Sequence, residues 1–374
     1  MAVQGPACDL PDPSAIEKYQ IAAQIANEVM NQLIVEAVPE KRIFDLCELG
    51  DRLIIKLADE ACSSGDKKKI KRGVAFPTCI SVNECIGHFC PGENNQDTLK
   101  KGQVAKIDLG VHIDGFISQC AHTVVIAQDD ESPLTGRAAD AICAAYYSAE
   151  CAARLIRPGN TNTQVTCMID KVASAFRCTP MEGVLSHQLK QHVIDANKVI
   201  MNKLSTSDQV HEITFEVNEA YCVDIVISTE EGKSRQRDAP TTIYKRAVDQ
   251  VYNLKLQSSR AVLSEINKNF RTMPFATRSL KDKKAKFGII ELISHNMLHP
   301  YPVLYEKNGA FVAQIKFTIL LLQDGQYRLN EFNAPYVSSQ YSISEYPEIA
   351  SILEEPNAER DQEAEIDPEV SAEP

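Results

Sequence analysis

The chain has 374 residues, which is enough to bury a substantial hydrophobic core in one large domain or two smaller ones. Its apolar content of 44% and charged content of 24% are ordinary for a soluble globular protein, and its longest apolar runs, such as 317–322, are too short to insert into a membrane. The formal net charge of −12 is concentrated at one end, because residues 345–374 carry eleven acids against Arg360 alone.

The first part of the chain predicts two amphipathic helices after a flexible N-terminus over residues 1–14. Apolar residues recur at helical spacing between residues 15 and 37, and again between residues 41 and 58. The residues that carry these two patterns are Ile21, Ile25, Val29 and Leu33, followed by Phe44, Leu46, Leu49, Leu53 and Leu57.

From residue 73 onward the pattern changes to short β-branched runs separated by polar turns, including VAFPT, VAKIDLGVHI and HTVVIA. An alanine-rich helix is predicted over 134–156, where the following Pro-Gly pair ends it. Thr161 or Thr163 is expected to cap the next helix, and strands are expected to resume near 213–228 and 303–321.

The two halves of the chain resemble each other weakly. In each half, helices precede a strand of the form apolar-Asp-apolar, centred on Asp108 in the first half and on Asp224 in the second. This repetition predicts one pseudo-symmetric α/β domain over residues 15–344, in which helices back a curved antiparallel sheet. Residues 233–300 interrupt the second half and are interpreted as a helical insert.

The tail over residues 345–374 is expected to be disordered, because it is acidic, rich in proline and almost without aromatic residues. It contains one short apolar spacing, formed by Ile349, Ile352 and Leu353, which is compatible with docking as a helix on a receptor or cofactor protein.

Five separated positions suggest the remains of a metal centre. Three apolar, strand-like runs each carry one inward polar residue, and a fourth segment, LSHQLKQH, offers a histidine. The five positions are Asp108, Gln119, His187, Asp224 and Lys316. Distant strands build dinuclear metal sites in this manner, but a lysine ammonium has only donors and cannot ligate a cation.

The sequence resembles a known family through several motifs, found roughly between residues 15 and 335: PTCISVNECIGHF, KIDLGVHIDGF, PGNTNTQVT, LSHQLKQHVID, TTIYKR, MPF and VLYEKNGAFVAQIKFT. They are similar to those of the proliferation-associated (ErbB-receptor-binding) protein family. That family is the catalytically silent relative of type II methionine aminopeptidases, which are peptidases of family M24. The resemblance implies the pita-bread fold of these enzymes.

The resemblance also implies which ligands have been lost. The aminopeptidases hold two metals with two aspartates, one histidine and two glutamates. In this chain Asp108 and His187 match the family's ligands, Asp224 replaces a glutamate, and Gln119 and Lys316 replace the remaining two carboxylates. His88, within ECIGHF, matches a histidine that contacts substrate and is interpreted as the relic of a substrate pocket.

The charges point to an inactive site on their own. A buried pair of divalent cations needs compensating carboxylates, whereas here two carboxylates remain and one lysine is added. Lys316 is therefore expected to pair with Asp108 or Asp224, and neither a cofactor nor a catalytic residue is expected. The alternative is an altered peptidase in which Asp108, His187 and Asp224 hold a single metal.

Two basic segments are candidates for nucleic-acid binding. Residues 233–286 carry fourteen lysines and arginines against four acids, and a second group lies at 67–72. Such patches attract phosphate backbones through counterion release. The contact candidates are Lys67, Lys68, Lys69, Lys71, Arg72, Lys233, Arg235, Arg237, Lys245, Arg246, Lys281, Lys283, Lys284 and Lys286.

The resemblance implies binding to the large ribosomal subunit or to structured RNA, with roles in ribosome biogenesis, translation and growth control. A receptor tail or transcription regulators are further partners that it suggests. A scaffold that binds only proteins is the alternative. A monomer is expected, because no heptad run occurs.

The cysteines and the targeting signals bear on the compartment. Twelve cysteines occur without a CxxC pair, and the start of the chain has no secretory pattern, so reduced thiols in the cytoplasm or nucleus are expected. Animal members of the family typically carry a lysine-rich run near the C-terminus, which this chain lacks. Nucleolar residence is therefore left open.

Overall fold

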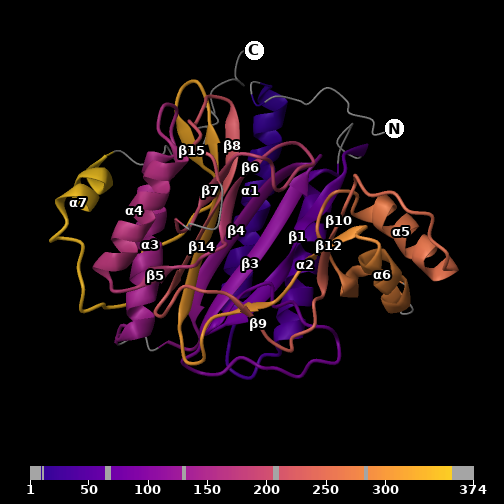
Figure 1. Cartoon of the computed structure of the whole chain (residues 1–374), viewed down its shortest axis with the longest axis horizontal. Coiled ribbons are helices and arrows are strands. Elements are labelled where there is room, and N and C mark those ends of the chain that lie inside the picture. Colours follow the sequence, from indigo (N-terminus) through magenta and orange to yellow (C-terminus); the bar gives the residue numbers. More distant parts are fainter. Residues whose placement is uncertain are drawn as a thin grey trace, which may run out of the picture.

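The computed structural model describes residues 10, 12–63, 69–128, 132–204, 210–281 and 285–355. Within this part of the chain, nine strands form one antiparallel sheet at the centre of the molecule (Figure 1). Its main path runs in the order β1 (Arg72–Val82), β3 (Val104–Ile113), β4 (Phe116–Val125), β14 (Val312–Leu321), β8 (Glu219–Ser228), β6 (Leu185–Leu189) and β7 (Val199–Met201). The short strands β15 (Gln326–Arg328) and β5 (Thr179–Pro180) pair with β14 and β8.

Two pairs of helices cover one face of this sheet. The first pair, α1 (Pro13–Glu36) and α2 (Ile43–Ala61), packs on β1, β3 and β4. The second pair, α3 (Arg137–Leu155) and α4 (Asn162–Ala175), packs on β8, β14 and β7. Each half of the chain therefore contributes a helix pair and its own hydrophobic core, and the expected pseudo-symmetric pita-bread architecture is confirmed.

Local sequence signals explain where these helices begin. The side chain of Asp12 accepts a hydrogen bond from the backbone of Ser14 at the start of α1, directly before Pro13. Thr161 and Gln164 form a capping box at the start of α4, so Thr161 rather than Thr163 is the cap.

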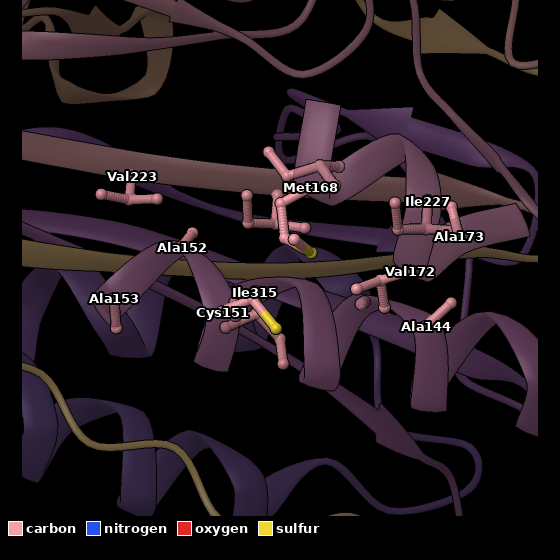
Figure 2. Close-up of a cluster of buried hydrophobic side chains, with 14 of the residues drawn as sticks. Ala144, Cys151, Ala152, Ala153, Met168, Val172, Ala173, Val223, Ile227 and Ile315 are labelled. Atoms are coloured by element: carbon pink, nitrogen blue, oxygen red, sulfur yellow. The ribbon is translucent and has the colours of Figure 1, made fainter. Parts of the chain in front are cut away.

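Small side chains let α3 lie close to its neighbours. Figure 2 shows Ala144, Cys151 and Ala152 of α3 in one cluster with Met168 and Val172 of α4 and with apolar residues of β8 and β14. Because alanine side chains are short, the helix backbone approaches the strands closely. The alanine-rich composition of α3 is thus a packing requirement as well as a helix-forming one.

The insert expected over residues 233–300 contains two helices and, in addition, a small sheet. Helices α5 (Gln257–Asn269) and α6 (Ala285–Ser294) pack on each other beside a small sheet, to the right in Figure 1. That sheet has the order β11 (Phe275–Ala276), β10 (Ile243–Arg246) and β12 (Leu298–Tyr301), and a 3-10 turn, η2 (Thr277–Ser279), follows β11. The insert has a separate core built around Val262, Ile266, Phe275, Ile289 and Leu292.

Strands also tie the insert to the domain. At its start, β9 (Arg235–Gln236) pairs with β13 (Leu304–Tyr305), which also pairs with β2 (Cys85–Gly87). Two strands, β13 and β14, lie within the range 303–321, where one was expected. The strand expected near 213–228 is β8, which begins only at Glu219. No helix in the described ranges is long and apolar enough to cross a membrane.

The terminal segments differ from expectation. Residues 347–354 were expected to be disordered and instead form helix α7 (Pro347–Glu354), at the left in Figure 1. Ile349 is buried in the core of the second half, and Ile352 and Leu353 pack against it, so this triplet docks on the protein itself. At the other end, α1 already includes Pro13 and Ser14, and Leu10 is buried. Residues 1–9 and 356–374 lie outside the described part.

Candidate functional site

Strand alternation places a set of polar residues on the face of the sheet opposite the helices. Asp108 lies between Ile107 and Leu109, which belong to the core under α1 and α2. Lys316 likewise lies between Ile315 and Phe317 of the other core. Because successive side chains of a strand point to opposite faces, the polar residue of each triplet points away from the helices.

These residues line one cavity of about 290 Å³, together with apolar and aromatic side chains. The cavity brings together all five positions that the sequence predicts to be the remains of a metal centre, as well as His88, although they are spread over more than 200 residues. Its polar lining comprises His88, Asp108, Gln119, His187, Asp195, Asp224, Gln314 and Lys316, and its apolar lining includes Phe76, Ile86, Ile194, Tyr301 and Leu304.

Strand register brings Lys316 between the two remaining carboxylates. Lys316 lies opposite Asp224 on β8 and opposite Ala121 on β4, and Ala121 in turn lies opposite Asp108 on β3. The ammonium Nζ atom is 2.6 Å from Oδ2 of Asp108 and 3.1 Å from Oδ2 of Asp224. The small side chain of Ala121 leaves room for the lysine to reach across β4.

One further polar residue completes the arrangement. Gln314, two residues before Lys316 and on the same face of β14, donates a hydrogen bond of 2.8 Å from Nε2 to Oδ1 of Asp224. Both oxygens of Asp224 therefore have partners. Oδ1 of Asp108 is buried and has no hydrogen-bond partner among the described residues. The sequence interpretation missed Gln314, although its spacing from Lys316 places both on one face.

Electrostatics favour a charged lysine. Burial by itself lowers the pKa of Lys316, but Asp108 and Asp224 outweigh this effect and raise the pKa well above its usual value. Burial raises the pKa of Asp108 to about 6, and the opposing attraction of Lys316 is offset in part by repulsion from Asp224. One ammonium shared by two buried carboxylates leaves an excess negative charge, which makes Asp108 harder to ionise.

His88 and the backbone of Gln119 have contacts within the protein, whereas Nδ1 of His187 is buried and has no hydrogen-bond partner among the described residues. The backbone N–H of Gln119 donates to Oγ1 of Thr318 over 2.9 Å. Nδ1 of His88 lies 3.0 Å from the carbonyl oxygen of Pro302, and its ring meets that of Tyr301 edge-on. Burial lowers the pKa of His88 and of His187, which favours neutral imidazoles in the cavity.

The residues present do not fit a pair of divalent metals. The ammonium group of Lys316 lies between the two carboxylates that would have to bridge or ligate the cations, and Gln119 provides an amide instead of a carboxylate. In the described part of the chain, no group of three or more histidines, cysteines, aspartates or glutamates is arranged to hold a metal ion.

Several basic candidates at the start of the insert are occupied within the protein. Arg235 pairs with Glu231 at 2.7 Å and with the buried Glu306 at 2.8 Å. Arg237 pairs with Glu84 at 3.2 Å and stacks on the ring of Tyr305. In β10, Lys245 pairs with Asp195, and Arg246 donates to backbone carbonyl groups of Ala247, Met297 and Gln250. Arg235, Arg237 and Lys245 thus help to fix the insert on the domain, whereas the partners of Arg246 lie within the insert itself.

Other basic candidates have exposed side chains without an ion-pair partner in the described part of the chain. Lys69, Lys71, Lys233 and Lys281 are exposed and pair with no carboxylate of the described part, whereas Arg72 pairs with Asp59 at 2.8 Å. The described part does not include Lys67, Lys68, Lys283 and Lys284 or the side chain of Lys286. The insert exposes further cations that the sequence interpretation did not single out, namely Lys255, Arg260, Lys268 and Arg271.

Comparison with known proteins agrees with this geometry. A sequence model described as metallopeptidase family M24 matches residues 17–245. The chain is 50% identical over 321 residues to a protein named ERBB-3 binding protein 1 from Arabidopsis thaliana, covering 86% of this chain and 81% of the relative. It is 42% identical over 339 residues to proliferation-associated protein A from Dictyostelium discoideum, covering 90% and 88% of the two chains.

Solved structures show the same relationship. A thermophilic Arx1 matches with a TM-score of 0.85 at 27% identity, covering 93% of this chain and 100% of the other. The fold and the family match thus define the class, which is that of M24 metallopeptidase-like proteins. Within that class, the chain belongs to the proliferation-associated (ErbB-3-binding) protein family, which confirms the resemblance seen in its motifs.

Proposed function

We propose that this protein is a non-catalytic relative of methionine aminopeptidases that binds the large ribosomal subunit or structured RNA. Its roles would lie in ribosome biogenesis, translation and growth regulation, in the cytoplasm and the nucleus. The observation that carries the non-catalytic part is the Lys316 ammonium group between Asp108 and Asp224. The exposed cations of the insert support the part that concerns RNA.

Lys316 argues against the single-metal alternative. A metal held by Asp108, His187 and Asp224 would have to displace an ammonium that already satisfies both carboxylates, and it would then lie beside a like charge. A lysine retained next to the cation would also repel it. We therefore favour a salt-bridged pocket without hydrolytic activity over an altered peptidase.

The peptidase alternative is tested by measuring methionine release from a methionyl peptide with added manganese or cobalt. We expect no release by the natural protein above a no-protein blank. The double variant Lys316→Glu and Gln119→Asp restores two carboxylates, and we expect it to bind divalent metal measurably by calorimetry. Metal-dependent release by the natural protein would contradict the proposal.

RNA binding is tested by removing exposed cations while keeping the internal ion pairs. A variant with Lys233, Lys268, Arg271 and Lys281 changed to glutamate should bind a structured ribosomal RNA fragment at least tenfold more weakly, because phosphate contacts are lost. A matched control changes four exposed lysines outside the insert, namely Lys56, Lys100, Lys101 and Lys190. Equal binding by the two variants would remove the insert from the RNA interface.

A scaffold that binds only proteins is distinguished by nuclease treatment. If the complex in cell extract persists after its RNA has been digested, protein contacts hold it together. If digestion releases the protein, RNA is part of the binding site, as proposed.

A further inference from the structure

Helix α6 of the insert has apolar residues on its outer face as well as on its inner face. Gly288 packs so closely on α5 that an added Cβ would lie 2.9 Å from Val262 and 3.0 Å from the carbonyl oxygen of Ser258. Ile289 and Leu292 are buried in the core of the insert. This packing fixes the inner face, so Phe287 and Ile290 point outward, and they are 69% and 64% exposed.

The loop before α5 extends this apolar surface. Glu291 of α6 accepts hydrogen bonds from the backbone N–H groups of Lys255 and Leu256, and the ring of Tyr252 stacks on that of His295 at 3.5 Å between ring centroids. The loop therefore runs alongside α6. It adds Leu256, which is 50% exposed, and Val251, which is 91% exposed. We call Val251, Leu256, Phe287 and Ile290 the α6 stripe.

The stripe is unusual for a water-exposed surface. Exposed apolar surface that is gathered in one place on a folded protein marks an interaction site. Aliphatic side chains make up most of the stripe. Bases are recognised chiefly by hydrogen bonding and by stacking on aromatic or arginine planes, so a surface of this composition suits protein better than RNA.

The surrounding charge specifies the partner further. Lys255 directly precedes Leu256 in the loop, Lys281 lies shortly before α6, and both are exposed without a carboxylate partner in the described ranges. Glu265 and Glu291 accept hydrogen bonds from backbone N–H groups but keep their charge, and over residues 249–291 nine lysines and arginines outnumber four acids. An apolar stripe with basic borders is complementary to an acidic segment that presents apolar side chains on one face.

We propose that the α6 stripe is a docking surface for an acidic amphipathic helix of another protein. The partner's apolar side chains, spaced by three or four residues, would cover Phe287 and Ile290, and its carboxylates would pair with Lys255 and Lys281. This surface lies on the insert, away from the cavity of the degenerate metal centre, and its function does not depend on RNA binding.

The proposal is tested by fluorescence anisotropy of the full chain with a labelled helical peptide that has leucines on one face and glutamates elsewhere. We expect saturable binding by the natural protein and at least tenfold weaker binding by the double variant Phe287→Ser and Ile290→Ser. The matched control is Val35→Ser, an exposed apolar residue of α1 outside the insert, which should bind as the natural protein does. A peptide with serines in place of the leucines should not bind.

Three results would overturn the proposal. One is no saturable binding of the acidic peptide, or binding that the double variant leaves unchanged. Another is weaker binding of a ribosomal RNA fragment by the double variant while the peptide does not bind, which would assign the stripe to RNA. The third is a concentration-dependent dimer in light scattering that the double variant abolishes, which would assign the stripe to a second copy of the chain.

Discussion

At position 316 an ammonium group lies between two carboxylates that come from different strands, β3 and β8. A buried ion pair contributes little net stability compared with an apolar replacement of similar volume, but removal of one partner leaves uncompensated charge. Asp108 and Asp224 would then face each other across β4 and β14 without a cation. The lysine is therefore a structural residue of this pocket.

This position gives a direct prediction for stability. Lys316→Ala should lower the free energy of unfolding by about 3–5 kcal/mol, because the buried Asp108 and the partly buried Asp224 lose their shared cation. Urea denaturation followed by circular dichroism measures the change. Lys233→Ala is the control at an exposed, unpaired lysine and should change the midpoint little. Equal effects of the two substitutions would mean that the buried ion pairs do not form.

A second prediction concerns pH. Burial, and then the neighbouring His192, lower the pKa of His112 to about 4. The unfolded chain takes up a proton near pH 6.5, whereas the folded chain resists it, so this group destabilises the fold as pH falls from about 6.5 towards 4. Above pH 6.5 the effect is absent.

The variant His112→Gln should therefore lose less stability than the natural protein between pH 7.5 and pH 5, by about 2 kcal/mol. Urea midpoints at pH 7.5 and pH 5 measure this difference in stability. The comparison at pH 7.5 serves as the control, because the His112 imidazole is neutral there in both the folded and the unfolded chain. Parallel pH profiles would show that His112 is protonated equally in both states.

The sequence could predict part of the site at this scale. Alternating apolar and polar residues in the strands predicted that Asp108, Asp224 and Lys316 face one side, and the register then determines their contact. The internal partners of the basic residues could not be predicted, because Glu306, Glu84 and Asp195 are far from them in sequence. The sequence therefore could not distinguish basic residues with internal ion-pair partners from exposed lysines without them.

At the scale of elements, apolar periodicity predicted α1, α2 and α4, and alanine-rich composition followed by a Pro-Gly pair predicted α3. Neither signal predicted α7, because eight residues with three apolar positions gain their stability from docking rather than from helix propensity. The acidic composition of the surrounding tail masked this local signal.

Docking of α7 can be tested separately from the rest of the fold. Ile349→Asp should release the helix from α3 and α4, because a carboxylate cannot be buried there without a partner. Hydrogen exchange should then speed up at residues 348–354 while the central strands keep their protection. Ser351→Ala, at an exposed position of the same helix, is the control, and equal exchange in both variants would mean that Ile349 does not anchor α7.

One arginine anchors the insert to the first half. Arg278, next to β11, pairs with Asp51 of α2 and donates to the carbonyl oxygen of Cys47 over 3.1 Å. Arg278→Leu should leave Asp51 buried and unpaired, and we expect about 3–5 kcal/mol of destabilisation and faster limited proteolysis within the insert. The double variant Arg278→Leu with Asp51→Asn should recover part of this loss. Unchanged proteolysis in the single variant would argue against the anchor.

At the scale of the whole molecule, the two halves pack into one sheet whose helix-free face holds the pocket, while the insert extends from one side of it (Figure 1). The fold is that of M24 metallopeptidase-like proteins, but Lys316 occupies the space between the two carboxylates of the pocket. Exposed cations and an exposed apolar stripe are instead found together on the insert. This division favours a function in binding, carried mainly by the insert.

Sedimentation of the endogenous protein through sucrose gradients at low and high salt tests this account most directly. We predict that the protein co-migrates with the large ribosomal subunit at low salt and moves to the light fractions at high salt, since phosphate contacts weaken steeply as salt rises. Protein confined to the light fractions under both conditions would contradict the account.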